Sequence, residues 1–423
     1  FFFFQLVTCG FSRYRISFEK PIIFSKRTSD GRIVLRFFYK CVNITLYLFS
    51  TDIIWYYYEK ENIMSNDPKI SEKRYPAKTP RSIVENGEAH FGTFDAPFEN
   101  LNLLDCKKPC FIGLPAFIKR TRLTEWEAFE VNMDEGSLIS AVYNVGPIGF
   151  SIFVWYEKAE KKIYAWRNLV PVKRAHVAKQ LISDNCYCKT KKSEYSIVND
   201  FLNGKAQCKG YTKGKSGEFG IDISFERLSP LANGVMPLKK NKDGTFRNPL
   251  YSEKDFFKAT GTITVNGKTY RTNERSVGII DDHKGFYPWY AHYDWLTTMG
   301  KTVIDGEEKF FAFNLTRNQS ADQYNYNENV IWLEGKSFPL PPVVFTHKDG
   351  KKKTDEWYVR DEEGKGIVDI TFKIEKVFYM PIPGIVYYAL PYGKIYGYVT
   401  DPDGKKYVVD GMVGIGEDKT TRV

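Results

Sequence analysis

The chain contains 423 residues, of which 43% are hydrophobic and 26% are charged, and its formal net charge is +10. This length is sufficient for two ordinary domains or one large β architecture with a substantial core. The lysines fall in short runs typical of solvated turns, such as Lys239-Lys240-Asn241-Lys242, so the charge pattern argues against a nucleic-acid partner.

The first 63 residues differ from the rest of the chain, because they contain no Met and are richer in aromatic residues. One permitted back-translation of Lys60-Glu61-Asn62-Ile63 resembles a purine-rich ribosome-binding sequence. We therefore interpret Met64 as the start of the translated protein and residues 1–63 as an untranslated leader or a disordered segment. The alternative is a membrane anchor at residues 41–58, against which Asp52 argues because an acid within a bilayer span is costly.

A start at Met64 leaves no apolar run that could act as a signal peptide, which predicts a cytoplasmic protein with no stable membrane span. The cysteines after Met64 are odd in number and lack the regular spacing of a secreted disulfide fold, which indicates a reducing compartment. Cys106 and Cys110, like Cys186 and Cys188, are not spaced as zinc knuckles. We therefore expect no metal and no cofactor.

The region from Met64 to residue 235 divides into two predicted parts. Residues 64–97 are polar and contain prolines, as is typical of an extended arm. Residues 98–235 form a predicted N-terminal β domain, in which Phe129 and Val131 alternate with polar partners at the period of two expected of half-buried strands. Turn formers and charges between Leu228 and Thr260 mark the end of this domain.

Residues 250–423 form the predicted C-terminal β domain. Asn266-Gly267 stands between two alternating arms, as in a β-hairpin whose two central residues need positive φ, and Asp403-Gly404 separates another pair. Long segments with a helical period are scarce. The sequence therefore predicts an all-β protein of many short strands, arranged as barrels or sandwiches.

The densest group of reactive side chains lies between Asp281 and Trp295. If its first part is extended, neighbouring side chains point to opposite faces, so Asp281 and Asp282 cannot both enter one cavity. Asp281 would then share its face with His283. Only one of the two adjacent aspartates is therefore available to any single site.

The second part of this segment also divides into two faces. Trp289, Tyr293 and Trp295 share an aromatic face, which is either plain core or the wall of a ligand pocket. His292 and Asp294 share the opposite face with Cα atoms about 7 Å apart, and an imidazole and a carboxylate at that spacing can exchange a proton. The alternative for the polar face is a strand edge that faces solvent.

A second polar group, Asn325-Tyr326-Asn327-Glu328-Asn329, precedes a strand-like apolar run. Polar residues in this position commonly cap a turn. The alternative is that Glu328 and Asn329 lie at the mouth of a cavity, where an acid and an amide bind the polar end of a ligand.

A longer pattern extends over the C-terminal half. It consists of Gly278-Ile279-Ile280-Asp281, Lys284-Gly285, Pro288, Tyr293-Asp294-Trp295, Gly300, Phe313-Asn314-Leu315, Glu328-Asn329, Gly335, Val368-Asp369-Ile370-Thr371-Phe372 and residues 411–417. In its order it resembles the bacterial family known as domain of unknown function 2804. That family is distantly similar to two-domain lipocalin-like proteins such as hydroxyneurosporene synthase and tocopherol cyclase, whose substrates are long and apolar.

The resemblance implies two antiparallel lipocalin-like barrels or half-barrels in tandem, with a cleft in or between them. It favours Asp281 over Asp282 as the acid that enters the cleft, so the predicted catalytic groups are Asp281, His292 and Asp294. The predicted ligand-contacting residues are Lys284, Tyr287, Trp289, Tyr293, Trp295, Asn314, Glu328 and Asn329.

These residues are compatible with several functions. The first is a binding module for an apolar small molecule such as a lipid or isoprenoid. The second is a hydratase, isomerase or cyclase in which Asp281 or the pair of His292 and Asp294 donates a proton to an alkene or removes one, where an apolar pocket would keep the acid neutral. The third is a carbohydrate-active β-protein. Geometry distinguishes the first two, because an enzyme needs Asp281 in the same cavity as His292 or Glu328, whereas a carrier needs only an apolar cavity.

Overall fold

The computed structural model describes residues 22–27, 33–39, 42–48, 54–59, 70–110, 112–348 and 356–422, and the chain divides into two compact units, residues 1–66 and 67–423. The first unit contains an antiparallel sheet in the order β1-β2-β3-β4. Its strands are β1 (Ile22–Arg27), β2 (Ile33–Tyr39), β3 (Val42–Leu48) and β4 (Ile54–Glu59). β3 and β4 therefore occupy the interval weighed above as a membrane anchor. None of the helices in the described part of the chain combines the length and the apolar character needed to cross a bilayer.

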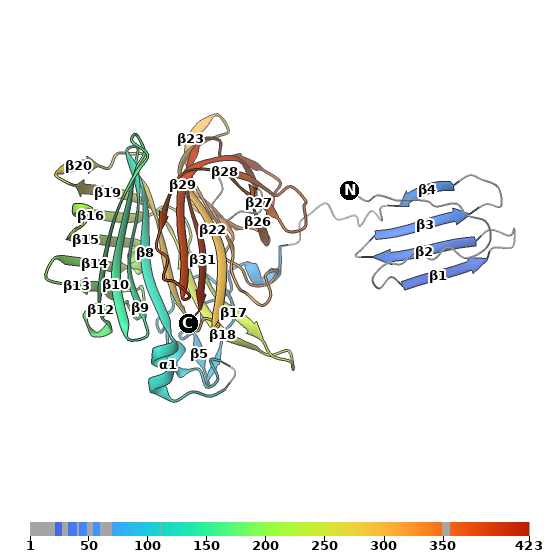
Figure 1. Cartoon of the computed structure of the whole chain (residues 1–423), viewed down its shortest axis with the longest axis horizontal. Coiled ribbons are helices and arrows are strands. Elements are labelled where there is room, and N and C mark those ends of the chain that lie inside the picture. The colour runs from blue at the N-terminus through green and yellow to red at the C-terminus, as the bar shows by residue number, and fades with distance from the viewer. Residues whose placement is uncertain are drawn as a thin grey trace. The chain divides into compact units, whose positions relative to one another are not determined.

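The second unit begins with a large antiparallel sheet that curves into a nearly closed barrel, which we call the first barrel (Figure 1). Its strands are β7 (Gly92–Phe94), β8 (Thr124–Asn132), β9 (Gly136–Val145), β10 (Ile148–Glu157), β11 (Lys162–Pro171), β12 (Ala175–His176), β13 (Asn185–Lys189), β14 (Ser193–Asp200), β15 (Lys205–Gly214), β16 (Gly217–Arg227), β17 (Ala232–Lys240), β18 (Phe246–Lys254), β19 (Phe256–Val265), β20 (Lys268–Arg271) and β21 (Val277–Gly285). The main path is β11-β10-β9-β8-β21-β19-β16-β15-β14-β13-β12.

The two ends of this path approach each other. A Cβ atom built on Gly149 of β10 would lie only 2.4 Å from Cβ of Ala175 in β12, so glycine is required where β12 packs on β10. The interior of the first barrel is filled by aromatic and aliphatic side chains from opposite walls, among them Phe129 and Phe225, whose rings stack at 4.2 Å. The interior of the first barrel is therefore a packed hydrophobic core.

A second antiparallel sheet forms a half-barrel, called here the second barrel, in the order β25-β24-β23-β22-β31-β29-β28-β27-β26. Its strands are β22 (Tyr290–Ile304), β23 (Glu307–Arg317), β24 (Val330–Leu333), β25 (Lys336–Pro339), β26 (Val343–His347), β27 (Glu356–Asp361), β28 (Val368–Tyr379), β29 (Val386–Thr400), β30 (Lys406–Val408) and β31 (Met412–Arg422). Its concave side encloses a separate core that includes Trp357, Phe372 and Ile395.

The remaining described elements are short. They are β5 (Val84–Glu85), β6 (Glu88–Ala89), α1 (Ala116–Arg122) and the 3-10 helices η1 (Glu72–Arg74), η2 (Leu103–Asp105), η3 (Val172–Arg174) and η4 (Phe201–Asn203). The prediction of an all-β fold with two tandem antiparallel barrels or half-barrels is thus confirmed. At the predicted Asn266-Gly267 hairpin both residues have positive φ, 50° and 83°.

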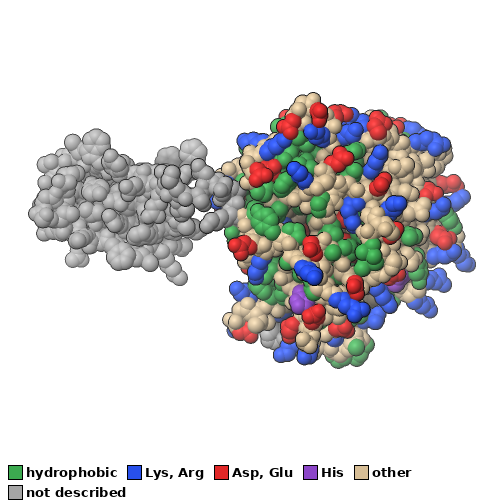
Figure 2. All heavy atoms as spheres, turned by 180° about the vertical axis from the view of Figure 1, so that it is seen from behind, with side chains coloured by type: hydrophobic (Ala, Val, Ile, Leu, Met, Phe, Trp, Pro, Cys, Tyr) green, Lys and Arg blue, Asp and Glu red, His purple; other side chains and the backbone are tan. Residues whose placement is uncertain are grey.

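The two barrels contact each other through the outer faces of their strands. Trp126 and Ala128 of β8 belong to the same buried cluster as Trp295 of β22 and Tyr392 of β29, and β8 lies beside β29 and β31 in Figure 1. β8 and β22 are consequently buried on both faces. One face of each strand points into the interior of its own barrel, and the opposite face lies between the barrels. On the outer surface seen in Figure 2, acidic and basic side chains are interspersed.

The change from one sheet to the other occurs between Gly285 and Tyr290. The boundary predicted between residues 235 and 250 lies within the first sheet, because β18 pairs with both β17 and β21. Part of the predicted extended arm, residues 64–69, lies outside the described residues. The rest carries Ile83, Val84 and Phe94 into a buried cluster beside the first barrel.

Candidate functional site

Two small cavities lie between the barrels and share Trp126, Asp281, Tyr293, Trp295 and Glu417 in their linings. We call them together the interbarrel site. Their volumes are about 30 and about 20 Å³, and one water molecule needs roughly 10–15 Å³ by the same measure. The site in this conformation therefore has room for a few atoms and not for a long apolar chain.

The charged centre of the site comes from two paired strands and one loop. Asp281 and His283 are two positions apart on β21, so their side chains lie on the same face of the strand. This face points away from the interior of the first barrel. Antiparallel pairing places Ser252 of β18 opposite His283, and Lys254 follows two residues later on the same face. Glu328 reaches the group from the loop before β24. We call Lys254, Asp281, His283 and Glu328 the interbarrel cluster.

His283 connects the two acids of this cluster. Its Nε2 is 2.8 Å from Glu328 Oε1 and 3.1 Å from Asp281 Oδ1, and its Nδ1 is 3.2 Å from the hydroxyl of Tyr287. Lys254 forms an ion pair with Asp281, and its Nζ is 3.9 Å from Glu328 Oε1. The imidazole of His283 thus lies between the phenol of Tyr287 and the two carboxylates, within ion-pair distance of both acids.

Both acids of the cluster are held in the ionised form. Burial opposes ionisation of Asp281, but Lys254 and His283 outweigh it and lower the pKa of its carboxyl group. Burial likewise opposes ionisation of Glu328, and His283, Lys254 and a hydrogen bond donated by Ser252 lower its pKa. The expectation that an apolar pocket keeps Asp281 neutral is therefore wrong, because a buried lysine lies beside it.

A neutral acid is supplied instead by Glu130, which was not among the residues predicted from the sequence. Glu130 is buried on β8 and lines the smaller cavity together with Asp281. Burial raises the pKa of Glu130 well above its ordinary value, and the charge of Asp281 raises it further. Its Oε2 has no hydrogen-bond partner among the described residues. One cavity thus combines a carboxyl group whose pKa is raised with one whose pKa is lowered.

This assignment makes a prediction about pH. In the unfolded chain Glu130 ionises near its ordinary pKa of 4.5, whereas in the folded protein it stays protonated to higher pH. In wild type, Glu130 therefore does not affect the free energy of unfolding below pH 4.5. Above pH 4.5 it lowers the free energy of unfolding by about 1.4 kcal/mol per pH unit, until Glu130 ionises in the folded protein. Glu130→Gln cannot ionise, so we expect it to be more stable than wild type at pH 8 and equal at pH 4.

Urea unfolding at pH 4, 6 and 8 measures this difference. The matched control is Glu226→Gln, because Glu226 is exposed on β16 and should show the same stability as wild type at each pH. A Glu130→Gln protein that gains no stability between pH 4 and pH 8 would contradict a neutral Glu130.

Aromatic rings form the walls of the interbarrel site. Trp126 stacks on His283 with ring centroids 4.6 Å apart and on Tyr287 at 5.7 Å. The ammonium group of Lys419 lies within 6 Å of the ring centroids of Trp126, Tyr143, Tyr293 and Tyr388. Burial raises the pKa of these tyrosines, so their phenols remain protonated.

Several of the predicted residues meet in the larger cavity. Its lining includes Asp281, Tyr287, Tyr293, Trp295 and Glu328, which come from both barrels. Asp281 therefore faces the same cavity as Glu328, which is the arrangement expected of an enzyme.

Asn314 and Asn329 lie just behind this lining. Asn314 accepts a hydrogen bond from Trp295 Nε1 at 2.5 Å and donates one to the carbonyl of Glu328 at 2.8 Å. Asn329 accepts a bond from the amide of Thr316 and donates one to the carbonyl of Pro341. Both side chains orient neighbouring residues and are not part of the cavity lining.

Lys284 and Trp289 do not reach the site. Lys284 points into the first barrel, where its Nζ is 3.2 Å from Asp282 and near Glu127, because it occupies the alternate position to His283 on β21. Trp289 precedes β22 and is 72% exposed. Their predicted roles as ligand contacts are therefore not supported by their positions.

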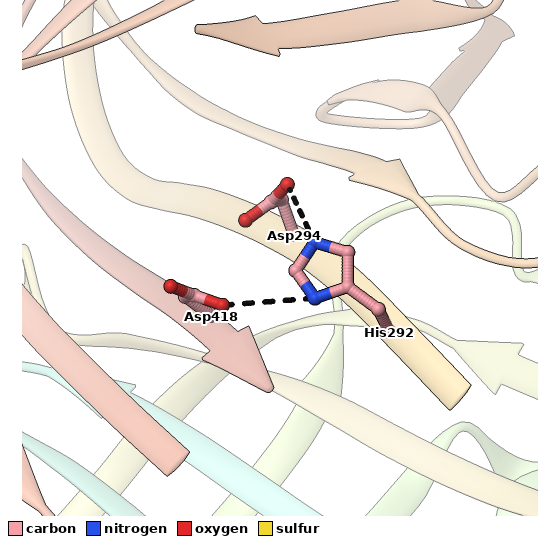
Figure 3. A group of neighbouring side chains, drawn as sticks. All are labelled: His292, Asp294 and Asp418. Carbon is pink, nitrogen blue, oxygen red and sulfur yellow. Dashed lines mark ion pairs between the residues drawn. The ribbon is translucent and has the colours of Figure 1, made fainter. Parts of the chain in front are cut away.

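His292 and Asp294 also lie outside the interbarrel site. They alternate with Tyr293 and Trp295 on β22, so they point toward the inside of the second barrel (Figure 3). His292 Nε2 is 3.4 Å from Asp294 Oδ2, and its Nδ1 is 3.8 Å from Asp418 Oδ1 on β31. Since Asp294 is buried, this face is not a solvent-facing edge. It forms a separate group from the one around Asp281.

The fold and the site define a class of protein: a tandem β-barrel protein in which buried ionisable residues converge between the barrels. Residues 77–423 match the family model described as Domain of unknown function (DUF2804). The chain belongs to this family, which confirms the resemblance found in the sequence. Comparison with the curated proteins gives no match.

Proposed function

We propose that the protein is an enzyme that admits the alkene group of an apolar small molecule between its two barrels and transfers a proton to and from one of its carbon atoms. The observation that carries this proposal is the pair of acids in one cavity, the buried Glu130 with a raised pKa and the half-buried Asp281 with a lowered pKa. Two acids whose surroundings drive their pKa values apart are suited to the roles of general acid and general base.

The cost of burying the interbarrel cluster favours an enzyme over a carrier. Each ion removed from water costs several kcal/mol, which ion pairing only partly offsets, and apolar residues of similar size are often more stable. A carrier of an apolar ligand gains nothing from Lys254, Asp281, His283 and Glu328 in its binding site. Such groups are expected where their charge takes part in chemistry.

The proposed reaction begins at an alkene. The carboxyl O–H bond of Glu130 breaks, the π electrons form a new C–H bond, and a cation develops on the adjacent carbon. The carboxylate of Asp281 stabilises this cation. Asp281 then accepts a proton from the neighbouring carbon, which gives an isomer, or from an attacking water molecule, which gives an alcohol. Return of that proton to Glu130 completes the cycle.

Deuterium incorporation tests the proposal even while the substrate is unidentified. Purified protein is incubated in D₂O with a small-molecule extract of the cells that make it, and the extract is then returned to H₂O and analysed by mass spectrometry. We expect wild type to introduce deuterium at a carbon position, where it does not exchange back. Glu130→Gln and Asp281→Asn should each reduce this labelling by at least about 100-fold.

The matched control is Asp222→Asn, because Asp222 is partly exposed on β16 of the first barrel and far in sequence from both acids. It should label as wild type does. Equal labelling by wild type and by both site variants, or no labelling by wild type, would contradict the proposed function.

A further inference from the structure

The group around His292 contains two buried carboxylates in an unfavourable position. Asp294 of β22 is directly opposite Asp418 of β31 in the antiparallel register, and both side chains are buried. Like charges directly opposite each other on paired strands destabilise a sheet, and burial increases the cost of each. The pair therefore requires a positive charge close to both carboxylates.

The nearby groups are imidazoles. His292 lies between the two acids in Figure 3, and on the other side of Asp294 the Nε2 of His347 is 3.4 Å from Asp294 Oδ1. Among the described residues, the ion-pair contacts of Asp294 are with His292 and His347. The imidazole of His292 and the two carboxylates form a mixed nitrogen and oxygen donor set of the kind that Zn²⁺ and similar dications prefer.

The distances fit metal ligands better than hydrogen bonds. His292 Nε2 is 3.4 Å from Asp294 Oδ2, which is longer than an N–H···O bond of roughly 2.7–3.2 Å. Two ligands bound tetrahedrally at about 2.1 Å from one ion lie about 3.4 Å apart. One ligand atom from each of His292, Asp294 and Asp418 already lies within 4.8 Å of the other two.

One further observation points to a bound ion. Asp294 is 8% exposed, and its Oδ1 has no hydrogen-bond partner in the described part of the chain. His292 Nδ1 is 3.0 Å from the hydroxyl of Thr420 and 3.8 Å from Asp418 Oδ1, so both residues help to fix the orientation of the imidazole.

We infer that His292, Asp294 and Asp418 form a binding site for a divalent transition-metal ion such as Zn²⁺ inside the second barrel. This site is on the face of β22 opposite the interbarrel site, and it does not depend on the proposed enzymatic function. Cross-linking β22 and β31 through one ion would hold these two paired strands of the second barrel together.

Calorimetric titration with Zn²⁺ tests the inference, with tag-free full-length protein that has been stripped with a chelator and dialysed. We expect one Zn²⁺ per chain, and a thermal unfolding temperature that rises with Zn²⁺ concentration. His292→Gln and Asp418→Asn should each weaken binding on the order of 100-fold, and Thr420→Val roughly 10-fold. Far-UV circular dichroism establishes that each variant is folded.

The matched control is His176→Gln. His176 is 3.5 Å from Asp184 in the first barrel, and its side chain is as exposed as that of His292. Among the described residues, however, His176 does not belong to a group of three possible metal ligands. This variant should bind Zn²⁺ as wild type does. Absence of binding to wild type, or equal binding by wild type, His292→Gln and Asp418→Asn, would show that the group is a histidine–carboxylate ion pair and would overturn the inference.

Discussion

Replacement of Lys254 by methionine is expected to lower the free energy of unfolding by about 3–5 kcal/mol at pH 7. Lys254 is 3% exposed, and its ammonium group is the buried cation that pairs with Asp281 and lies near Glu328. Methionine has a similar length but no charge, so both carboxylates would remain buried without this partner. Urea unfolding monitored by tryptophan fluorescence measures the loss.

The pH dependence of the loss identifies its cause. In wild type, the lowered pKa values of Asp281 and Glu328 contribute stability that is complete above the ordinary carboxyl pKa and disappears as pH falls through the folded values. In Lys254→Met the part of this contribution that comes from Lys254 is absent, whereas the part that comes from His283 remains. The difference between the two proteins should therefore shrink as the pH is lowered from 7 to 4.

The control for this variant is Lys209→Met, which breaks the ion pair of Lys209 with Asp222 on the surface of the first barrel. Exposed pairs contribute at most about 1 kcal/mol, so this variant should unfold close to wild type. If Lys254→Met were as stable as Lys209→Met at pH 7, the interbarrel cluster would not be the buried charge network described above.

The second large effect is expected from Trp126→Ala. Trp126 is 4% exposed, packs between the barrels, and stacks on both His283 and Tyr287. Removal of such a ring costs about 3–5 kcal/mol. Because Trp126 stacks on the ring of His283 and so fixes its orientation, we expect the variant to lose deuterium labelling activity as well as stability. Denaturant unfolding and the labelling assay measure the two effects separately.

Trp289→Ala is the matched control for this substitution. Trp289 belongs to the sequence motif that predicted the site, but its side chain is exposed. Its removal should change the free energy of unfolding by less than about 0.5 kcal/mol and should leave labelling unchanged. Equal effects of the two tryptophan substitutions would contradict the location of the site between the barrels.

The sequence predicted the parts of the site that depend on strand alternation. Because side chains of a strand point to alternate faces, Asp281 and His283 could be assigned to one side and Asp282 to the other from the order of the residues alone. The same rule separated Tyr293 and Trp295 from His292 and Asp294. Hairpin residues such as Asn266-Gly267 also identified where strands reverse.

Strand pairing could not be predicted in the same way. Lys254 reaches Asp281 because β18 pairs with β21, and Glu130 approaches because β8 pairs with the other edge of β21. Neither pairing is visible in one sequence. A signal for Glu130 did exist, since it is an acid on the same strand face as Trp126 and Ala128, but without the register that face had no known neighbour.

Alternation also could not show that both faces of β21 and β22 are buried. Each strand lies in the wall of a barrel and also contacts the other barrel, so polar side chains on both faces form buried groups. Lys284 therefore belongs to the interior of the first barrel, and His292 to that of the second. The motif between Asp281 and Trp295 is dense in reactive residues because it connects three separate environments.

The central claim is that one cavity contains a neutral Glu130 and an ionised Asp281. Infrared difference spectroscopy at neutral pH measures this directly, because the carbonyl stretch of a carboxylic acid differs from the stretches of a carboxylate. The spectrum of wild type minus Glu130→Gln should contain a carboxylic acid band, and that of wild type minus Asp281→Asn should contain only carboxylate bands. Carboxylate bands in the first spectrum, or an acid band in the second, would contradict the proposed assignment of acid and base.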